Sequence, residues 1–358
     1  MKRTMLFLAA AAAFAACSKN EVALVTPSED TEITFNVAPR TKALAENQED
    51  FDHENVFVSY AYYLGPGKTW NADNSEAKPY ITGSTISFVG GVWKNAETTY
   101  YWPKDNGSLT FFAYSYNKKD MNVTGDYTGF TCVWKKDEGG NYCGGINGHI
   151  DVEANKNVDF LVADIATDKT ANETTYAHSG VPTLFRHRLS WVNVYAKLAQ
   201  NYANKKFTIN SIKFQKIHHY ATYNQIPESM TPGADDTNDD QVYAENASFE
   251  VVNSDEYVKV APVIKGGTAD EEGQYIYIPQ VFGDDSYIEV RYTIETTVTG
   301  GSVVTENCVK KVPVKDVFAQ WEMGHRYTLN ITFTLNEILW DPAVQEWIDD
   351  AAGSITID

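Results

Sequence analysis

Residues 32–39 read EITFNVAP, a segment in which apolar and polar side chains alternate. Ile33, Phe35 and Val37 fall on one face, and Thr34 and Asn36 fall on the other. This period of two is typical of a β-strand that buries one face. The segment therefore predicts that the folded part of the chain begins with a strand.

Similar strand patterns continue along the chain, separated by clusters of Gly, Asn and Asp that favour turns. We expect strands at 55–64, 84–93, 108–116, 158–164, 185–198, 207–223, 243–252, 274–281, 286–298, 306–314 and 325–335. Many short strands with little helical pattern favour an all-β fold of antiparallel sandwiches. We therefore predict two tandem β-sandwich domains, at 32–181 and 182–358, with the boundary near Pro182.

One short helix is expected near the C-terminus, over residues 341–352. Asp341 can cap its first turn, and Pro342 would occupy the first helical position, where proline is tolerated.

The N-terminal residues have the composition of an export signal. Lys2 and Arg3 precede an apolar run at 5–16 that is too short to span a bilayer, and Cys17 follows directly. This arrangement resembles a lipobox, the site at which bacterial signal peptidase II cuts before a lipidated cysteine. We expect residues 1–16 to be a signal peptide, Cys17 to carry the lipid, and the polar residues 17–31 to form a tether.

The net charge excludes one class of partner. The chain has 29 Lys and Arg against 48 Asp and Glu, a formal charge of −19, with no basic cluster. Such a chain is not expected to bind the phosphate backbone of a nucleic acid.

The remaining cysteines are Cys132, Cys143 and Cys308. Cys132 and Cys143 flank a turn signal between two short runs, so a disulfide across this hairpin is one interpretation in an exported protein. Two reduced thiols are the other interpretation.

The sequence contains no nucleophile elbow, zinc-protease motif or phosphate-binding loop. The acidic run at 235–240 begins like a calcium loop but has Gln241 where glycine is required. We therefore predict no enzyme activity, no metal and no cofactor.

Four further stretches carry a family resemblance: YYWPKDNGSLTFFAYS (100–115), VDFLVAD (158–164), LFRHRLSWVNVYAKL (184–198) and HRYTLNITFTLNEILWDPAVQEW (325–347). In this order, together with the lipobox, they resemble the fimbrillin family of Bacteroidales. The resemblance implies a pair of transthyretin-like β-sandwich domains. It also implies a lipoprotein at the outer membrane that assembles with other fimbrial subunits.

In that family an arginine-specific protease cuts a loop after the first strand, and a strand from the next subunit fills the groove. Here the resemblance implies cleavage between Arg40 and Thr41, with release of the strand that carries Ile33, Phe35 and Val37. The candidate donor is the C-terminal GSITID, in which Ile355 and Ile357 alternate with polar residues. The alternative is a monomeric, anchor or tip lipoprotein that binds a glycan or a host or bacterial surface ligand.

Overall fold

The computed structural model describes residues 31–39, 51–118, 121–123, 129–136, 138, 142–172, 180–233, 241–245, 247–263 and 273–347. Across these ranges strands dominate. The helical elements are limited to α1 (Trp70–Asp73), α2 (Val314–Val317) and the 3-10 turn η1 (Asn74–Glu76). The all-β class predicted from the sequence is confirmed.

The first lobe is built around a sheet that closes on itself. Its strands, in hydrogen-bonded order, are β2 (Phe57–Leu64), β3 (Lys78–Val89), β4 (Val92–Asn95), β1 (Phe35–Pro39), β10 (Val181–His187), β8 (Leu161–Ala163), β5 (Ser108–Ser115) and β9 (Ala166–Lys169). Strand β2 pairs with β5 as well as with β3, so the path from β2 through β1 and β10 returns to its start. The strands β2, β3, β4, β1, β10, β8 and β5 therefore form a ring, and β9 pairs with the other end of β5.

The interior of this ring is mainly aromatic. Its fully buried side chains include Phe35, Phe57, Trp93, Phe111 and Phe185. Alternation along each strand places one row of side chains inside the ring and the other row outside.

The outer face of β2 and β5 is covered by a four-stranded sheet, ordered β14 (Glu228–Pro232), β13 (Tyr220–Ile226), β7 (Tyr142–Asp151) and β6 (Thr131–Lys136). Phe112 and Tyr114 of β5 pack with Ile146 of β7 and Tyr223 of β13 in this second core. This sheet joins segments that are far apart in the sequence.

The second lobe is a sandwich of two sheets. One sheet is ordered β17 (Val258–Val260), β11 (Ser190–Leu198), β23 (His325–Phe333) and β24 (Ile338–Glu346), and β18 (Ile276–Tyr277) also pairs with β11. The other is ordered β15 (Gln241–Ala244), β12 (Lys205–Gln215), β20 (Tyr287–Thr297) and β21 (Val303–Pro313), and β16 (Phe249–Val251) also pairs with β12. A two-stranded sheet consists of β19 (Gln280–Val281) and β22 (Gln320–Trp321).

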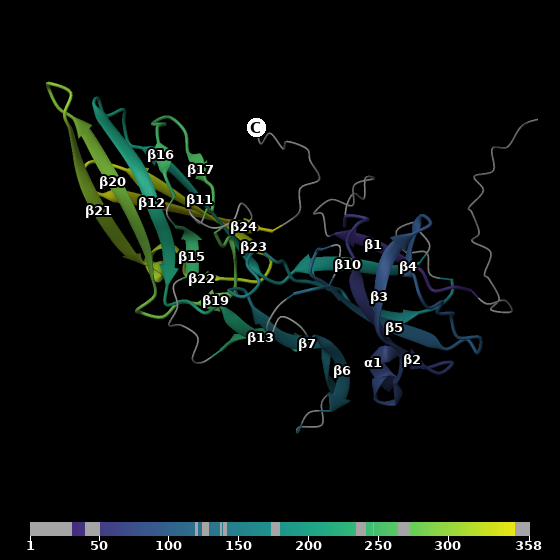
Figure 1. The fold of residues 1–358 in the computed structure, drawn as a ribbon. Coiled ribbons are helices and arrows are strands. Elements are labelled where there is room, and N and C mark those ends of the chain that lie inside the picture. The colour runs from purple at the N-terminus through teal and green to yellow at the C-terminus, as the bar shows by residue number, and fades with distance from the viewer. Residues whose placement is uncertain are drawn as a thin grey trace, which may run out of the picture.

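A single buried cluster fills the space between the two larger sheets. Its side chains come from both, such as Phe214 and Ile288 from one sheet and Leu329 and Phe333 from the other. Figure 1 shows this sandwich on the left and the ring on the right, with β6, β7 and β13 below and between them.

Two segments that were predicted as single strands are each divided between sheets. The segment 185–198 separates into β10, which belongs to the ring, and β11, which runs parallel to β23 in the sandwich. The segment 207–223 separates into β12 and β13 in the same way. The predicted boundary at Pro182 falls inside β10, and the pairing of β7 with β13 crosses it.

The expected helix at 341–352 is wrong for the residues that the structure describes. Residues 338–346 form β24, which pairs with β23 from Phe333↔Ile338 to His325↔Glu346. A turn at 334–337, stabilised by the Thr334 side chain, folds the chain back on itself. Pro342 is tolerated because β24 is an edge strand. Residues 348–352 lie outside the described part of the chain.

Candidate functional site

The first strand occupies a slot between β4 and β10. Strand β1 runs parallel to β10 from Phe35↔Val181 to Pro39↔Phe185, and on its other edge Phe35 pairs with Trp93 of β4. Immediately upstream, the backbone N–H of Ile33 donates to the carbonyl of Tyr100 at 2.8 Å. The segment is therefore paired on both edges at Phe35, and from there to Pro39 it pairs with β10.

The alternation predicted for this segment is confirmed. Ile33 and Phe35 are buried at 3% and 5% exposure, and Val37 is partly buried against the same cluster. The Phe35 ring makes edge contacts with Phe57 and Phe111, with centroids 5.4 and 5.8 Å apart. Burial of these side chains contributes roughly 4–7 kcal/mol, at about 1.5–3 kcal/mol for each fully buried one.

Gly180 allows the first strand to approach β10 closely. Its φ is +110°, and a Cβ there would lie 3.0 Å from the carbonyl carbon of Phe35 and 3.0 Å from the carbonyl oxygen of Thr34. Only glycine combines that backbone conformation with that contact at low cost. The N–H of the next residue, Val181, donates to the same Thr34 carbonyl at 2.8 Å.

The described residues on either side of 40–50 are both next to Phe185 of β10. Pro39, the last residue of β1, stands opposite Phe185 in the ladder. Phe51, where the described chain resumes, stacks on the Phe185 ring at a centroid distance of 5.0 Å. Arg40 and Thr41 lie between these two points and outside the described residues. The cleavage between them stays a prediction.

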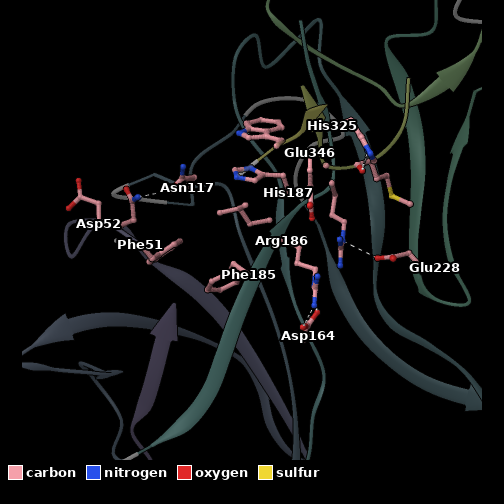
Figure 2. A pocket seen from close by; sticks show the side chains of 16 residues that line it. Phe51, Asp52, Asn117, Asp164, Phe185, Arg186, His187, Glu228, His325 and Glu346 are labelled. Carbon is pink, nitrogen blue, oxygen red and sulfur yellow. Dashed lines mark hydrogen bonds and ion pairs between the residues drawn. The ribbon is translucent and has the colours of Figure 1, made fainter. Parts of the chain in front are cut away.

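A cavity of about 810 Å³ lies beside this region, at the junction of the lobes. Figure 2 shows Phe185, Arg186 and His187 of β10 among the side chains that line this cavity. Its lining residues are Phe51, Asp52, Asn55, Asn117, Leu161, Asp164, Phe185, Arg186, His187, Arg188, Glu228, Met323, Gly324, His325, Glu346 and Trp347.

The charges in the cavity are largely paired with one another. Arg186 forms a two-point ion pair with Asp164, with both N···O distances 2.5 Å, and this carboxylate raises the pKa of the guanidinium. The Nε of Arg188 lies 2.9 Å from Glu228. Paired arginines hold the cavity wall in place and present little unbalanced charge.

A buried His–Asp pair of the first lobe lies where the end of the second lobe packs against it. Nδ1 of His187 lies 2.7 Å from Asp159, and both side chains are buried. The imidazole also stacks on Trp347, which follows β24, with ring centroids 3.9 Å apart. This contact ties the end of β24 to β10.

The lining of the cavity consists mainly of charged, amide and aromatic side chains. None of its described lining residues is a serine, threonine or cysteine that could act as a nucleophile. In the part of the chain that the structure describes, no group of three or more His, Cys, Asp or Glu side chains could hold a metal ion.

The cysteines do not form the hairpin disulfide that was one interpretation of the sequence. Cys132 is a free thiol that stands opposite Ile146, whereas Cys143 stands opposite Lys135. An offset of three positions along the ladder is about 10 Å, which is too long for a disulfide. Burial raises the pKa of the Cys132 thiol to about 12.

The other predicted site residues, namely Cys17, Ile355 and Ile357, lie outside the described residues. Over the residues that the structure does describe, none of the helices has the length and apolar character needed to cross a bilayer. Sequence reasoning missed β10 as the partner of the first strand and missed the junction cavity. Gly180 was the available signal for a close backbone approach.

Comparisons with known proteins identify a family match and solved structures with a similar fold. The family model described as fimbrillin-like matches residues 41–347. A fimbrial protein from Bacteroides vulgatus ATCC 8482 has a TM-score of 0.62 at 17% identity, and the match covers 88% of this chain and 99% of that one. This likeness shows a shared fold.

Two proteins described as candidate cell adhesion proteins are more distant in structure. The one from Bacteroides uniformis ATCC 8492 has a TM-score of 0.43 at 15% identity, covering 89% of this chain and 100% of its own. The one from Bacteroides ovatus ATCC 8483 has a TM-score of 0.43 at 16% identity, covering 90% and 99%. No curated protein matches the sequence.

Proposed function

The chain belongs to the fimbrillin-like family, and from that premise we propose that it is a subunit of an adhesive surface fimbria without enzyme activity. The name of the Bacteroides vulgatus protein, which shares the fold, supports this assignment. The proposed partners are other fimbrial subunits, and the proposed location is the cell surface.

We propose further that the subunit polymerises by donor-strand exchange after the first strand is released. The observation that supports this best is the position of β1, which fills a slot in the ring between β4 and β10. Removing it would open the ring and expose the unpaired edge of β10 together with an apolar groove. An incoming strand would restore both the ladder and the buried surface, as in β-augmentation.

The release step would be a cut between Arg40 and Thr41, directly after β1. Phe51 stays anchored in the ring core through Phe185 and Phe57, so the chain that follows the cut would remain attached to the ring. The proposed donor is the C-terminal segment GSITID, with Ile355 and Ile357, which follows β24 in the chain. Lipidation at Cys17 would hold the uncut subunit at the outer membrane.

The test uses the chain from Ser18 onward, which contains every described residue, and an arginine-specific protease. After Ser18 the other arginines are Arg186, Arg188, Arg291 and Arg326. Three of these lie in strands, and Arg188 is buried beside β10. We therefore expect a single cut after Arg40, identified by mass spectrometry of the new N-terminus, followed by a ladder of multimers on unheated denaturing gels.

The matched control is Arg40→Ala, which should remain uncut and monomeric. A ladder that forms equally well from Arg40→Ala would contradict cleavage at this bond. A clean cut that leaves a monomer would favour the second candidate function, an anchor, tip or stand-alone lipoprotein. The junction cavity of about 810 Å³ favours that candidate, since it is large enough for a small ligand such as part of a glycan.

A further inference from the structure

The strand β21 is a long, exposed sheet edge in the second lobe. It pairs with β20 along its whole length, from Tyr287↔Pro313 to Thr297↔Val303. In Figure 1 it is the outermost strand of the sandwich on the left. No strand among the described residues pairs with its other edge.

This edge carries exposed apolar side chains among its polar ones. Val303, Val304 and Val309 are exposed at 56%, 57% and 49%. Proline is absent from 303–312, so alternate residues present both N–H and C=O groups away from β20. A long edge of this kind is a template for pairing with another strand.

The sequence of β21 is complementary to itself in one antiparallel register. When two copies are related by a two-fold axis perpendicular to the sheet, the residue at the axis stands opposite its own counterpart. The numbers of any two paired residues therefore add up to twice the number of that central residue. When the axis passes through Cys308, Glu306 stands opposite Lys310 of the second copy, and the pair occurs twice. Val304 then stands opposite Val312. Shifting the centre by one residue loses both charge pairs, because Glu306 then faces Cys308 or Val312.

The face of β21 that carries Cys308 is turned toward the core of the sandwich, where Cys308 and Lys310 are half-buried and Glu306 is exposed. Glu306, Cys308 and Lys310 share one face of the strand, and the Lys310 ammonium donates to the carbonyl of Asn336 at 3.0 Å. Lys311 lies on the opposite face, where its ammonium is 3.0 Å from Glu289. Lys310 is therefore the lysine on the same face as Glu306.

We infer that β21 is a self-association edge, at which a second copy of this chain pairs antiparallel in the register centred on Cys308. The sheet β15-β12-β20-β21 would then continue into the same sheet of the second copy. A contact between single strands is small, so the dimer is weak and forms at high local concentration. The competing interpretation is that Lys310 and Lys311 protect the edge against pairing.

Disulfide trapping can test this register directly. Paired Cys308 residues would have Cα atoms about 4.5–5.5 Å apart, within the range that a disulfide bridges. The chain from Ser18 onward is oxidised with diamide, which takes up two electrons and two protons as two thiols become one disulfide. Dimers are then quantified on non-reducing gels at several protein concentrations.

Three kinds of variant make the test specific. Cys308→Ser keeps Cys132 and Cys143 and measures any background from them. Asn307→Cys in the Cys308→Ser background tests the neighbouring register, because its two thiols would be too far apart in the proposed one. Glu306→Lys and Lys310→Glu place like charges opposite one another, and the double exchange places opposite charges together again.

The expected result is a disulfide-linked dimer of the unmodified chain. Cys308→Ser should give only the background from Cys132 and Cys143, and adding Asn307→Cys to it should give no more dimer than that background. Each single charge reversal should reduce trapping about tenfold, and the double exchange should restore it. Circular dichroism melting of each variant confirms that it is folded. The inference is overturned if the unmodified chain gives no Cys308 dimer, if single reversals leave trapping unchanged, or if the double exchange does not restore it.

Discussion

Replacing Phe35 with alanine should destabilise the ring of the first lobe more than Ile33→Val or Val37→Ala in the same strand. The side chain is 5% exposed, and its ring contacts Phe57 and Phe111 in the ring interior. Truncating a buried phenylalanine costs about 3–5 kcal/mol, because the cavity that it leaves is filled only partly by relaxation. That is a large share of the stability of an ordinary domain.

Two neighbouring positions provide graded controls. Val37 is only partly buried, so Val37→Ala should cost about 1 kcal/mol. Ile33→Val removes one buried methylene and should cost about 0.5–1.5 kcal/mol. The predicted order of destabilisation therefore follows the volume of buried side chain that is removed: Phe35→Ala has the largest effect.

Hydrogen–deuterium exchange read by mass spectrometry is the suitable assay, since it reports each strand separately. Peptides from β1, β4 and β10 should lose protection in Phe35→Ala, while peptides from β20 in the second lobe keep theirs. Equal loss of protection in both lobes would refute the reasoning that β1 stabilises its own ring. A loss no greater than that of Val37→Ala would refute the magnitude.

Three further changes test other parts of the structure. Gly180→Ala places a Cβ 3.0 Å from the backbone of the first strand at a φ of +110°. It should therefore lower the free energy of unfolding, measured in urea, by about 1–3 kcal/mol. An unchanged urea midpoint would contradict the close approach. Asp159→Ala removes the carboxylate that lies 2.7 Å from Nδ1 of the buried His187, so it should lower the free energy of unfolding by about 1–3 kcal/mol. A melting temperature equal to that of the unmodified chain would show that this pair does not stabilise the fold. Burial raises the pKa of Cys132 to about 12, so only about one thiol in ten thousand is thiolate at pH 8. Its alkylation by iodoacetamide should therefore be slow and rise about tenfold for each pH unit up to 11, and rapid labelling at pH 8 would refute this protection.

The alternation of side chains predicted the strands whose faces differ in environment. EITFNVAP alternates because one of its faces is in the ring core. The strand expected at 108–116 forms β5 (Ser108–Ser115), but every residue of it is buried, so it is recognised as a short run bounded by turn signals and not by alternation. Both patterns reflect which side chains of the strand are buried, and the order of apolar and polar residues along the strand indicates this directly.

Long segments with a continuous strand pattern could not be divided into separate strands from the sequence. In FRHRLSWVNVYAKL the strand pattern continues through Arg188 and Leu189, although the chain changes sheets there. The N–H of Arg188 donates to the carbonyl of Phe160 at 2.9 Å, and the carbonyl of Leu189 accepts from Gly324 at 3.1 Å. These partners are distant in sequence, so a local pattern carries no information about them.

The wrong helix near the C-terminus has a similar cause. Asp341 and Pro342 have the local features of a helix start, but Ile338, Trp340, Pro342 and Val344 also alternate as a strand does. Pairing with all nine residues of β23 decided between these two patterns. Tertiary pairing outweighs intrinsic preference when both are present, because each ladder position satisfies backbone groups that a short helix leaves open.

The unpaired backbone groups also distinguish the two proposed interaction surfaces. Strand β1 already pairs with β10 and, at Phe35, with β4, so in the proposed assembly its slot becomes free only after cleavage. Strand β21 has a partner on one edge among the described residues, so it can pair without any covalent change. The first surface lies in the ring and the second in the sandwich. A fibre could therefore grow through the slot of β1 while copies associate laterally through β21, and failure of either experiment leaves the other proposal standing.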